Sequence, residues 1–90
     1  GPYLVTADEV DDPQNLDIKL WVNEDLKQSF NTDDRDVKIP RIIEWFSYIQ
    51  ELEPGDVIDT GTSHRGLSAL QNDDKVELEV QGLGTLHVNI

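Results

Sequence analysis

The chain has 90 residues, which is the size of one small domain, and it contains no cysteine, so no disulfide or thiolate metal site can stabilise it. Seven basic against 19 acidic residues give a net charge of −12. This charge disfavours nucleic acid and other phosphate-bearing partners, and it indicates a solvated acidic surface, as in a protein of a salt-tolerant organism.

The first predicted element is an antiparallel hairpin at residues 16–30. The apolar residues of its first arm alternate with polar or aromatic neighbours at the two-residue period of a strand, and they are Leu16, Ile18, Leu20 and Val22. Asn23-Glu24 interrupts the alternation, and Asn readily adopts a positive φ at a hairpin turn. Residues 16–22 and 25–30 are therefore expected to pair.

One helix is predicted at about 40–52. Pro40 suits its first turn, and apolar residues then recur at helical spacing as Ile42, Phe46, Ile49 and Leu52. This stripe predicts a face that packs on a core, with a partner-binding face as the alternative. The helix should end at Glu53-Pro54-Gly55-Asp56, because Pro cannot continue the hydrogen-bond ladder and Gly supplies the positive φ of a tight turn.

The remaining chain predicts strands and a polar loop. Val57 and Ile58 suggest a short strand over 57–60 that leads into Thr60-Gly61-Thr62. A second hairpin is expected at 76–90, with its turn at 82–84 and alternating apolar residues in both arms, namely Val76, Leu78, Val80, Leu86, Val88 and Ile90. His87 falls on the polar side of the last strand and should be exposed. The predicted fold class is mainly β with one α-helix, an α+β arrangement of antiparallel hairpins.

Five segments distributed over nearly the whole chain carry a more specific signal. They are GPYLVTADEVDDPQNL at 1–16, VNEDLKQ at 22–28, NTDD at 31–34, IPRIIEWFSYIQELEPGDVIDTGT at 39–62 and VELEVQGLGTLHVNI at 76–90. In order and spacing they resemble the C-terminal part of the catalytic domain of the fumarylacetoacetate hydrolase family. The resemblance implies that residues 1–90 form a single partial domain, a fragment of that family's mixed β-sandwich roll.

The resemblance also implies an enzyme that acts on a 2-oxo acid. Members of the family bind Mg²⁺, or Mn²⁺ or Ca²⁺, through carboxylates, and such an ion polarises the ketone and stabilises the enolate that forms during the reaction. The family's metal ligands and catalytic residues lie upstream of these segments, so none is assigned to this chain. The implied reaction is acylpyruvate-type C–C hydrolysis, hydration or dehydration, decarboxylation or isomerisation. The alternative is a catalytically silent structural or self-associating fragment.

The Thr60-Gly61-Thr62 turn is where the resemblance implies a substrate contact. The family positions a threonine there against the carboxylate or oxo group of the substrate, which points to Thr62, and Gly61 would permit close backbone approach. His64 and Arg65 follow where the commonest family pattern has a proline and then a small segment. They would set specificity as a proton carrier and a carboxylate clamp, or they are exposed loop residues.

Partners and location follow from the same features. No apolar run approaches the roughly 18 to 20 residues of a membrane span, and the N-terminus lacks a basic region followed by an apolar core, so a cytoplasmic protein without membrane contact is expected. Besides the 2-oxo acid, the expected partner is a second copy of the chain or an N-terminal half that carries the metal ligands. Trp21 and Trp45 are candidates for that interface.

The first two residues and the acidic clusters each allow two interpretations. Family members carry Gly-Pro before the aromatic residue that corresponds to Tyr3, so Gly1-Pro2 is interpreted as native and not as a scar of protease cleavage. The acidic cluster at 8–12 is interpreted as a solvated loop, because it lacks the alternating ligands and central glycine of a calcium loop. A cation-binding module of the acidic clusters at 8–12 and 33–36 is the weaker alternative.

Overall fold

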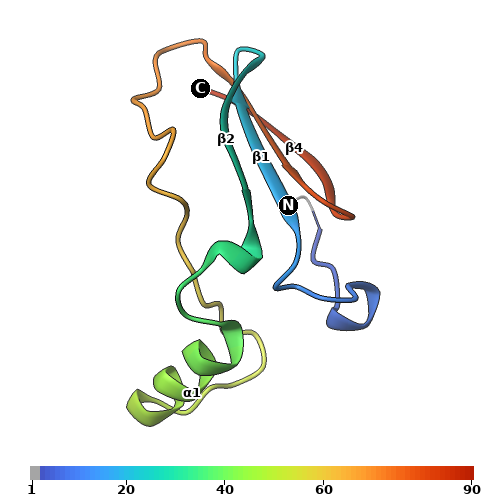
Figure 1. Cartoon of the computed structure of the whole chain (residues 1–90), viewed down its shortest axis with the longest axis vertical. Coiled ribbons are helices and arrows are strands. Elements are labelled where there is room, and N and C mark those ends of the chain that lie inside the picture. The colour runs from blue at the N-terminus through green and yellow to red at the C-terminus, as the bar shows by residue number, and fades with distance from the viewer. Residues whose placement is uncertain (1–2) are drawn as a thin grey trace.

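The computed structural model describes residues 3–90 as one four-stranded antiparallel sheet from which a helix extends (Figure 1). The elements are η1 (Ala7–Glu9), β1 (Asp17–Val22), β2 (Asp25–Asn31), η2 (Thr32–Asp34), α1 (Ile39–Ile49), β3 (Lys75–Val80) and β4 (Gly84–Asn89). The predicted class, mainly β with one α-helix, is confirmed. The interpretation of Gly1-Pro2 falls outside the described residues.

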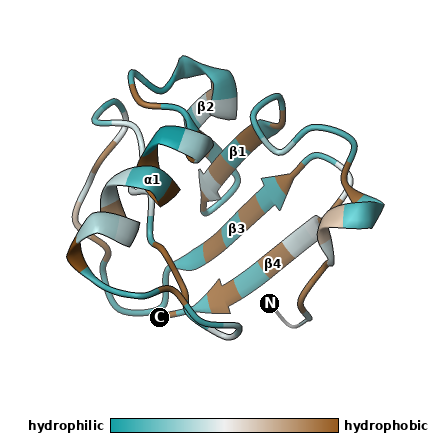
Figure 2. Cartoon of the chain, turned by 90° about the horizontal axis from the view of Figure 1, so that it is seen from below, coloured by the Kyte–Doolittle hydropathy of each residue, from teal (hydrophilic) through white to brown (hydrophobic). Residues whose placement is uncertain are grey.

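Both predicted hairpins are present. The β1–β2 turn has φ values of 50° at Asn23 and 71° at Glu24, and two positive φ values in a two-residue loop match the twist of the flanking strands. The β3–β4 turn contains Gly82 with φ 78°. Figure 2 shows teal and brown bands alternating along β3 and β4, the pattern of strands with one apolar and one polar face.

The two hairpins join through β1 and β3, so the strand order is β2-β1-β3-β4. No sequence pattern predicted this pairing, which places Leu20 opposite Leu78 and Val22 opposite Val76. Asn23 closes the end of the pair, because its N–H donates to the carbonyl oxygen of Lys75 at 2.8 Å and its Oδ1 accepts from the Lys75 N–H at 3.0 Å. Val22, at this end of the sheet, is only 8% exposed.

Helix α1 begins one residue earlier and ends three residues earlier than predicted. The Ile39 N–H donates to Oε1 of Gln14 at 2.7 Å, which satisfies one of the free donors of the first turn. Gln50 leaves the helical conformation with φ −150° and ψ 155°. Continuing to residue 52 would place the carboxylate of Glu51 at the negative end of the helix dipole. The turn predicted at 53–56 is present, with φ 99° at Gly55.

The strand predicted over 57–60 is wrong. Within residues 3–90 this segment pairs with no strand, and Val57 is 91% exposed. Two β-branched residues favour an extended backbone, but a strand also needs a neighbour for its N–H and C=O groups. The coil that follows α1 instead runs back along β2 (Figure 1).

Much apolar surface of this chain is uncovered. The accessible surface is 7353 Å², whereas a compact monomer of this mass would expose roughly 5,300 Å². Helix α1 lies away from the sheet (Figure 1), and none of its residues is buried. The predicted core packing of its stripe holds only in part, because Ile42 and Phe46 are half-buried while Ile49 is 62% exposed.

No helix in the described part of the chain combines the length and the apolar character that crossing a membrane requires.

Candidate functional site

A cleft of about 830 Å³ lies between β2, residues 34–37 and the loop that follows α1. Its lining includes three of the four predicted site residues, Thr62, His64 and Arg65. The fourth, Gly61, is adjacent to this lining. The structure therefore brings the predicted residues together at one cleft, along the side of strand β2.

Gln28 holds the loop from the β2 side. Only 7% of this residue is exposed, and its Nε2 donates hydrogen bonds to the backbone carbonyl oxygens of Ser63 and Arg65, both at 2.8 Å. Its Oε1 lies 3.4 Å from the Thr62 hydroxyl, which donates to it. A single buried amide thus contacts three residues of the loop, and we call residues 60–66 the site loop.

Arg35 holds the start of the site loop. Its Nη1 donates to the carbonyl oxygen of Thr60 at 2.6 Å, and its Nη2 lies 3.5 Å from the carbonyl oxygen of Gly61. The planar guanidinium can reach two neighbouring carbonyls because its donors point in fixed, diverging directions. Residues 60–65 are therefore fastened to β2 and to the segment after η2.

Two glycines shape the site loop for different reasons. Gly61 has φ 74°, a backbone conformation that favours glycine. A Cβ at this position would meet no atom of the described residues within 4 Å, so the requirement for glycine comes from the backbone angle and not from lack of space. Gly66 has φ 76°, and a Cβ there would overlap the backbone carbonyl of Lys27 in β2. Only a glycine lets the loop backbone come this close to the strand.

The three predicted side chains at the cleft are exposed. The Thr62 hydroxyl makes one hydrogen bond, to Gln28, and 3.4 Å is long for a bond between two oxygens. Within residues 3–90, the side chains of His64 and Arg65 make no hydrogen bond or ion pair. All three groups can therefore reorient toward a bound molecule at small cost.

Sequence reasoning missed Gln28 and Arg35. Gln28 did carry a signal, because it stands two positions before Phe30 and so occupies an inward position of β2 with a polar side chain. An inward amide needs partners, and here the partners are loop carbonyls. Arg35 carried no comparable signal, since its role depends on where a distant segment lies.

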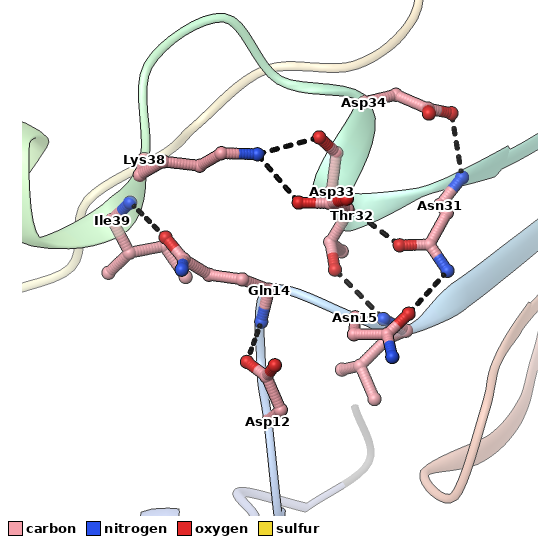
Figure 3. A network of polar contacts seen from close by, with 10 residues as sticks. Asp12, Gln14, Asn15, Asn31, Thr32, Asp33, Asp34, Lys38 and Ile39 are labelled. Atoms are coloured by element: carbon pink, nitrogen blue, oxygen red, sulfur yellow. Dashed lines mark hydrogen bonds and ion pairs between the residues drawn. The ribbon is translucent and has the colours of Figure 1, made fainter.

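A polar network lies at the end of β2 (Figure 3), and two of its members, Asn31 and Asp34, line the cleft. Asn31 and Asp34 form a capping box, in which the Asn31 N–H donates to Asp34 Oδ2 at 3.1 Å. Thr32 exchanges hydrogen bonds with Leu16, donating its N–H and accepting from the Leu16 N–H, both at 2.9 Å. These contacts fix η2, and with it the residues just before Arg35.

The acidic residues do not assemble a metal site in the part of the chain that the structure describes. No three side chains among its His, Asp and Glu residues converge to hold an ion. In the two acidic clusters, Asp12 accepts from the Gln14 N–H at 2.9 Å and Asp33 pairs with Lys38 at 2.7 Å. A local hydrogen bond and a surface ion pair thus occupy these two carboxylates, and within residues 3–90 no group of three donors fits a divalent ion.

His87 lies where the alternation predicted, on an exposed face of β4. Its Nδ1 is 3.8 Å from a carboxylate oxygen of Glu77, directly opposite on β3. The sheet places this histidine outside the lining of the cleft.

Comparison with known proteins gives consistent results. Residues 1–90 match the family described as fumarylacetoacetate (FAA) hydrolase C-terminal. The 4-hydroxyphenylacetate degradation bifunctional isomerase/decarboxylase of Salmonella dublin is 42% identical over 86 residues, which cover 96% of this chain and 20% of that protein. Maleylpyruvate hydrolase of Aquipseudomonas alcaligenes is 37% identical over 90 residues, covering all of this chain and 31% of that protein.

A solved structure agrees with these relatives. Maleylpyruvate hydrolase from Sphingobium sp. SYK-6, in complex with a manganese(II) ion and pyruvate, superposes with a TM-score of 0.93 at 42% identity. The match covers 99% of this chain and 33% of that one. The chain thus spans between a fifth and a third of the length of these relatives.

Proposed function

Because this chain belongs to the fumarylacetoacetate hydrolase family, we propose that it is part of an enzyme that acts on a 2-oxo acid, and that the cleft beside β2 is one wall of the substrate site. The proposed reactions are those that pass through an enolate, namely C–C hydrolysis of an acylpyruvate, hydration or dehydration, decarboxylation and isomerisation. The relatives whose names specify a hydrolase or an isomerase/decarboxylase support this class.

The observation that carries the proposal is the position of Thr62. It lines the cleft on a loop that Gln28 holds from one side and Arg35 from the other. The long hydrogen bond from its hydroxyl to Gln28 can be exchanged for a shorter one to the substrate, either a charge-assisted bond to a carboxylate or a bond to the oxo oxygen. Gly61 next to it has no side chain that would block such an approach.

Basic side chains at the cleft can meet an anionic substrate. Although the chain carries a net charge of −12, the cleft lining has three basic residues against two acidic ones, namely Lys27, Arg35 and Arg65 against Asp34 and Asp36. Arg65, whose side chain has no partner among the described residues, is proposed to hold a carboxylate, and His64 to carry a proton or contact a polar substituent. These two residues are the proposed determinants of specificity.

The described residues do not fit a divalent metal site, so we place the ligands of the ion outside residues 3–90. The manganese(II) ion in the Sphingobium enzyme supports a divalent metal in a relative, and Mg²⁺ is the ion we propose for the enzyme to which this chain belongs. The part played by residues 3–90 is to bind and orient the substrate.

A second candidate function has its own observation. Helix α1 exposes apolar side chains to solvent, including those of Trp45 and Tyr48. Such a surface suits association with another copy of the chain or with the remainder of the enzyme. Alone, the 90-residue chain would then be a catalytically silent, self-associating module, and the intact enzyme a homo-oligomer.

Turnover by the intact protein tests the first proposal. Consumption of the substrate and release of pyruvate-type products are both measured across acylpyruvates and 2-oxo-alkenedioates, with Mg²⁺ or Mn²⁺ and again with excess chelator. Metal-dependent turnover of at least one compound is expected, and its absence across the whole panel would count against the proposal. Silence of the 90-residue chain is tested by calorimetry with Mg²⁺ and oxalate, where tight metal-dependent binding would refute it.

A further inference from the structure

The buried amide of Gln28 is the only side chain in the described structure that bonds to three residues of the site loop. We propose that Gln28 is a positioning residue of the substrate site, which sets the place of the Thr62 hydroxyl and of the Arg65 backbone and acts on the substrate through them. This inference rests on the proposed function of the cleft.

The orientation of the amide is fixed by its partners. Ser63 and Arg65 present carbonyl oxygens, which can only accept, so the atom 2.8 Å from both must be the nitrogen. The amide oxygen then faces Thr62 and can only accept, so the hydroxyl of Thr62 must donate in the unliganded state. The two bonds that the Gln28 nitrogen donates to Ser63 and Arg65 therefore determine that the Thr62 hydroxyl points its hydrogen toward the Gln28 oxygen.

Few side chains can replace this group. The position needs two N–H donors and one acceptor on a neutral group, because it is 7% exposed and an unpaired charge would be costly there. An ionised glutamate has the same length but offers no donor, and it would face two carbonyl oxygens. A methionine has a similar volume and leaves both carbonyls without a partner.

The close approach of the loop to β2 is a separate observation that agrees. Gly66 lies against the carbonyl of Lys27, the residue before Gln28, so the loop backbone touches the strand immediately beside the amide. A loop held at this distance gives the amide short bonds to both carbonyls. If the loop moved outward, Thr62 and Arg65 would move with it.

The test uses the intact protein in its metal-loaded form, with oxalate as the probe. Gln28→Met is expected to weaken oxalate binding about tenfold, since two hydrogen bonds to the loop are lost. Gln50→Met is the matched control, because Gln50 is exposed and its side chain makes no hydrogen bond in the described structure. It should bind oxalate like wild type. Equal affinity of wild type and Gln28→Met would overturn the proposal.

Gln28→Glu separates positioning from a general structural role through its pH profile. At about pH 8 the introduced carboxylate has no donor, and binding should be weaker than in Gln28→Met. Toward about pH 5, burial helps the carboxylate to take up a proton, and the resulting O–H can donate to one loop carbonyl. The oxalate affinity relative to wild type should then recover severalfold, whereas the ratio for Gln28→Met stays flat. A flat ratio for Gln28→Glu would contradict the proposal.

A double-mutant cycle asks whether Gln28 acts through Thr62. If it does, the loss of oxalate affinity in Gln28→Met combined with Thr62→Val should be smaller than the product of the two single losses, and the part that remains reports the route through Arg65. Losses that multiply fully would mean that Gln28 acts independently of Thr62, and that result would overturn the proposal.

Hydrogen exchange keeps this inference separate from the proposed function. In the intact protein, amide exchange at Gly61 and Arg65, whose N–H groups donate to Asp59 Oδ1 and Ser63 Oγ, should be severalfold faster in Gln28→Met than in wild type or Gln50→Met. This measurement needs no substrate, so it remains decisive even if the protein turns over no 2-oxo acid. Unchanged exchange at these two positions would show that the Gln28 amide does not hold the loop.

Discussion

The guanidinium of Arg35 donates a 2.6 Å hydrogen bond to the backbone carbonyl oxygen of Thr60, 25 positions later in the chain. This bond links the exit of η2 to the residue that begins the site loop. With the Gln28 bonds farther along, it fixes both ends of the segment that carries Thr62. The anchors come from β2 and its continuation, while the proposed contacts come from the loop.

Arg35→Met should loosen the start of the site loop. The variant loses the hydrogen bonds to the Thr60 and Gly61 carbonyl oxygens, and water replaces only part of their effect. We therefore expect kcat/KM to fall about fivefold, mainly through a higher KM. Arg35→Lys should recover only part of it, because an ammonium group lacks the guanidinium fork. The control Arg41→Met removes an exposed pair with Glu44 and should change kcat/KM little. Equal kinetics of Arg35→Met and wild type would contradict the anchoring role.

Gly66→Ala should be far more damaging than Gly82→Ala. The two glycines have φ values of 76° and 78°, so each substitution carries a similar backbone cost of roughly 1 kcal/mol. Only at Gly66 would the new Cβ overlap a backbone carbonyl, that of Lys27, which should add about 1–3 kcal/mol. Denaturant unfolding of the two variants of the intact protein gives the difference, and equal stabilities would disprove the close approach.

Asp74 should make the stability of the β1–β3 end depend on pH. A hydrogen bond from the Gln71 backbone N–H, then one from the Asn23 side chain, and the charge of Lys27 lower the pKa of Asp74 below its ordinary value of 3.8. A lowered folded-state pKa contributes stability above the unfolded pKa, and this contribution disappears as the pH falls through the folded value.

The corresponding measurement is the unfolding midpoint of the intact protein as the pH is lowered from neutrality. Asp74→Asn should be less stable than wild type near neutral pH, and the two curves should converge in acid. Asp73→Asn is the control, because Asp73 has φ 69°, which Asn tolerates, and its side chain makes no hydrogen bond in the described structure. A gap between Asp74→Asn and wild type that stays constant into acid would contradict this account.

The open apolar face of α1 should make the isolated 90-residue chain associate. The accessible surface of the chain exceeds that of a compact monomer of its mass, and the exposed Trp45 forms a T-shaped pair with Phe46, with ring centroids 5.0 Å apart. Light scattering should show concentration-dependent association that Trp45→Gln reduces, whereas the exposed control Ser47→Gln does not. A monomer at all concentrations, unaffected by Trp45→Gln, would argue against this surface.

Local patterns predicted the elements whose causes are local. The alternation of Leu16 to Val22 and the turn residues at Asn23-Glu24 specified the first hairpin, because strand period and positive φ are properties of neighbouring residues. For the same reason the predicted start of α1, Pro40, lies within one residue of the actual start, Ile39. His87 was placed on the exposed face by its phase in the strand.

Features that depend on distant segments were not predicted, or were predicted wrongly. The pairing of Val22 with Val76 and the bond of Gln28 to Ser63 join residues that no local pattern relates. The strand over 57–60 was wrong because a strand requires a partner, and none lies beside Val57 in the described residues. For the site, resemblance to the family indicated the loop, whereas the anchors that hold it became visible only in three dimensions.

The most direct test of the central proposal is the kcat/KM of the Thr62→Val variant of the intact protein. It is measured in the presence of Mg²⁺ on the 2-oxo acid that wild type converts best. Loss of a hydrogen bond to a charged oxygen is worth about 1.5–3 kcal/mol, so kcat/KM should fall roughly 10- to 150-fold. Thr85→Val, an exposed substitution in β4 outside the cleft, should match wild type. If Thr62→Val matched wild type as well, the cleft beside β2 would not be the substrate site.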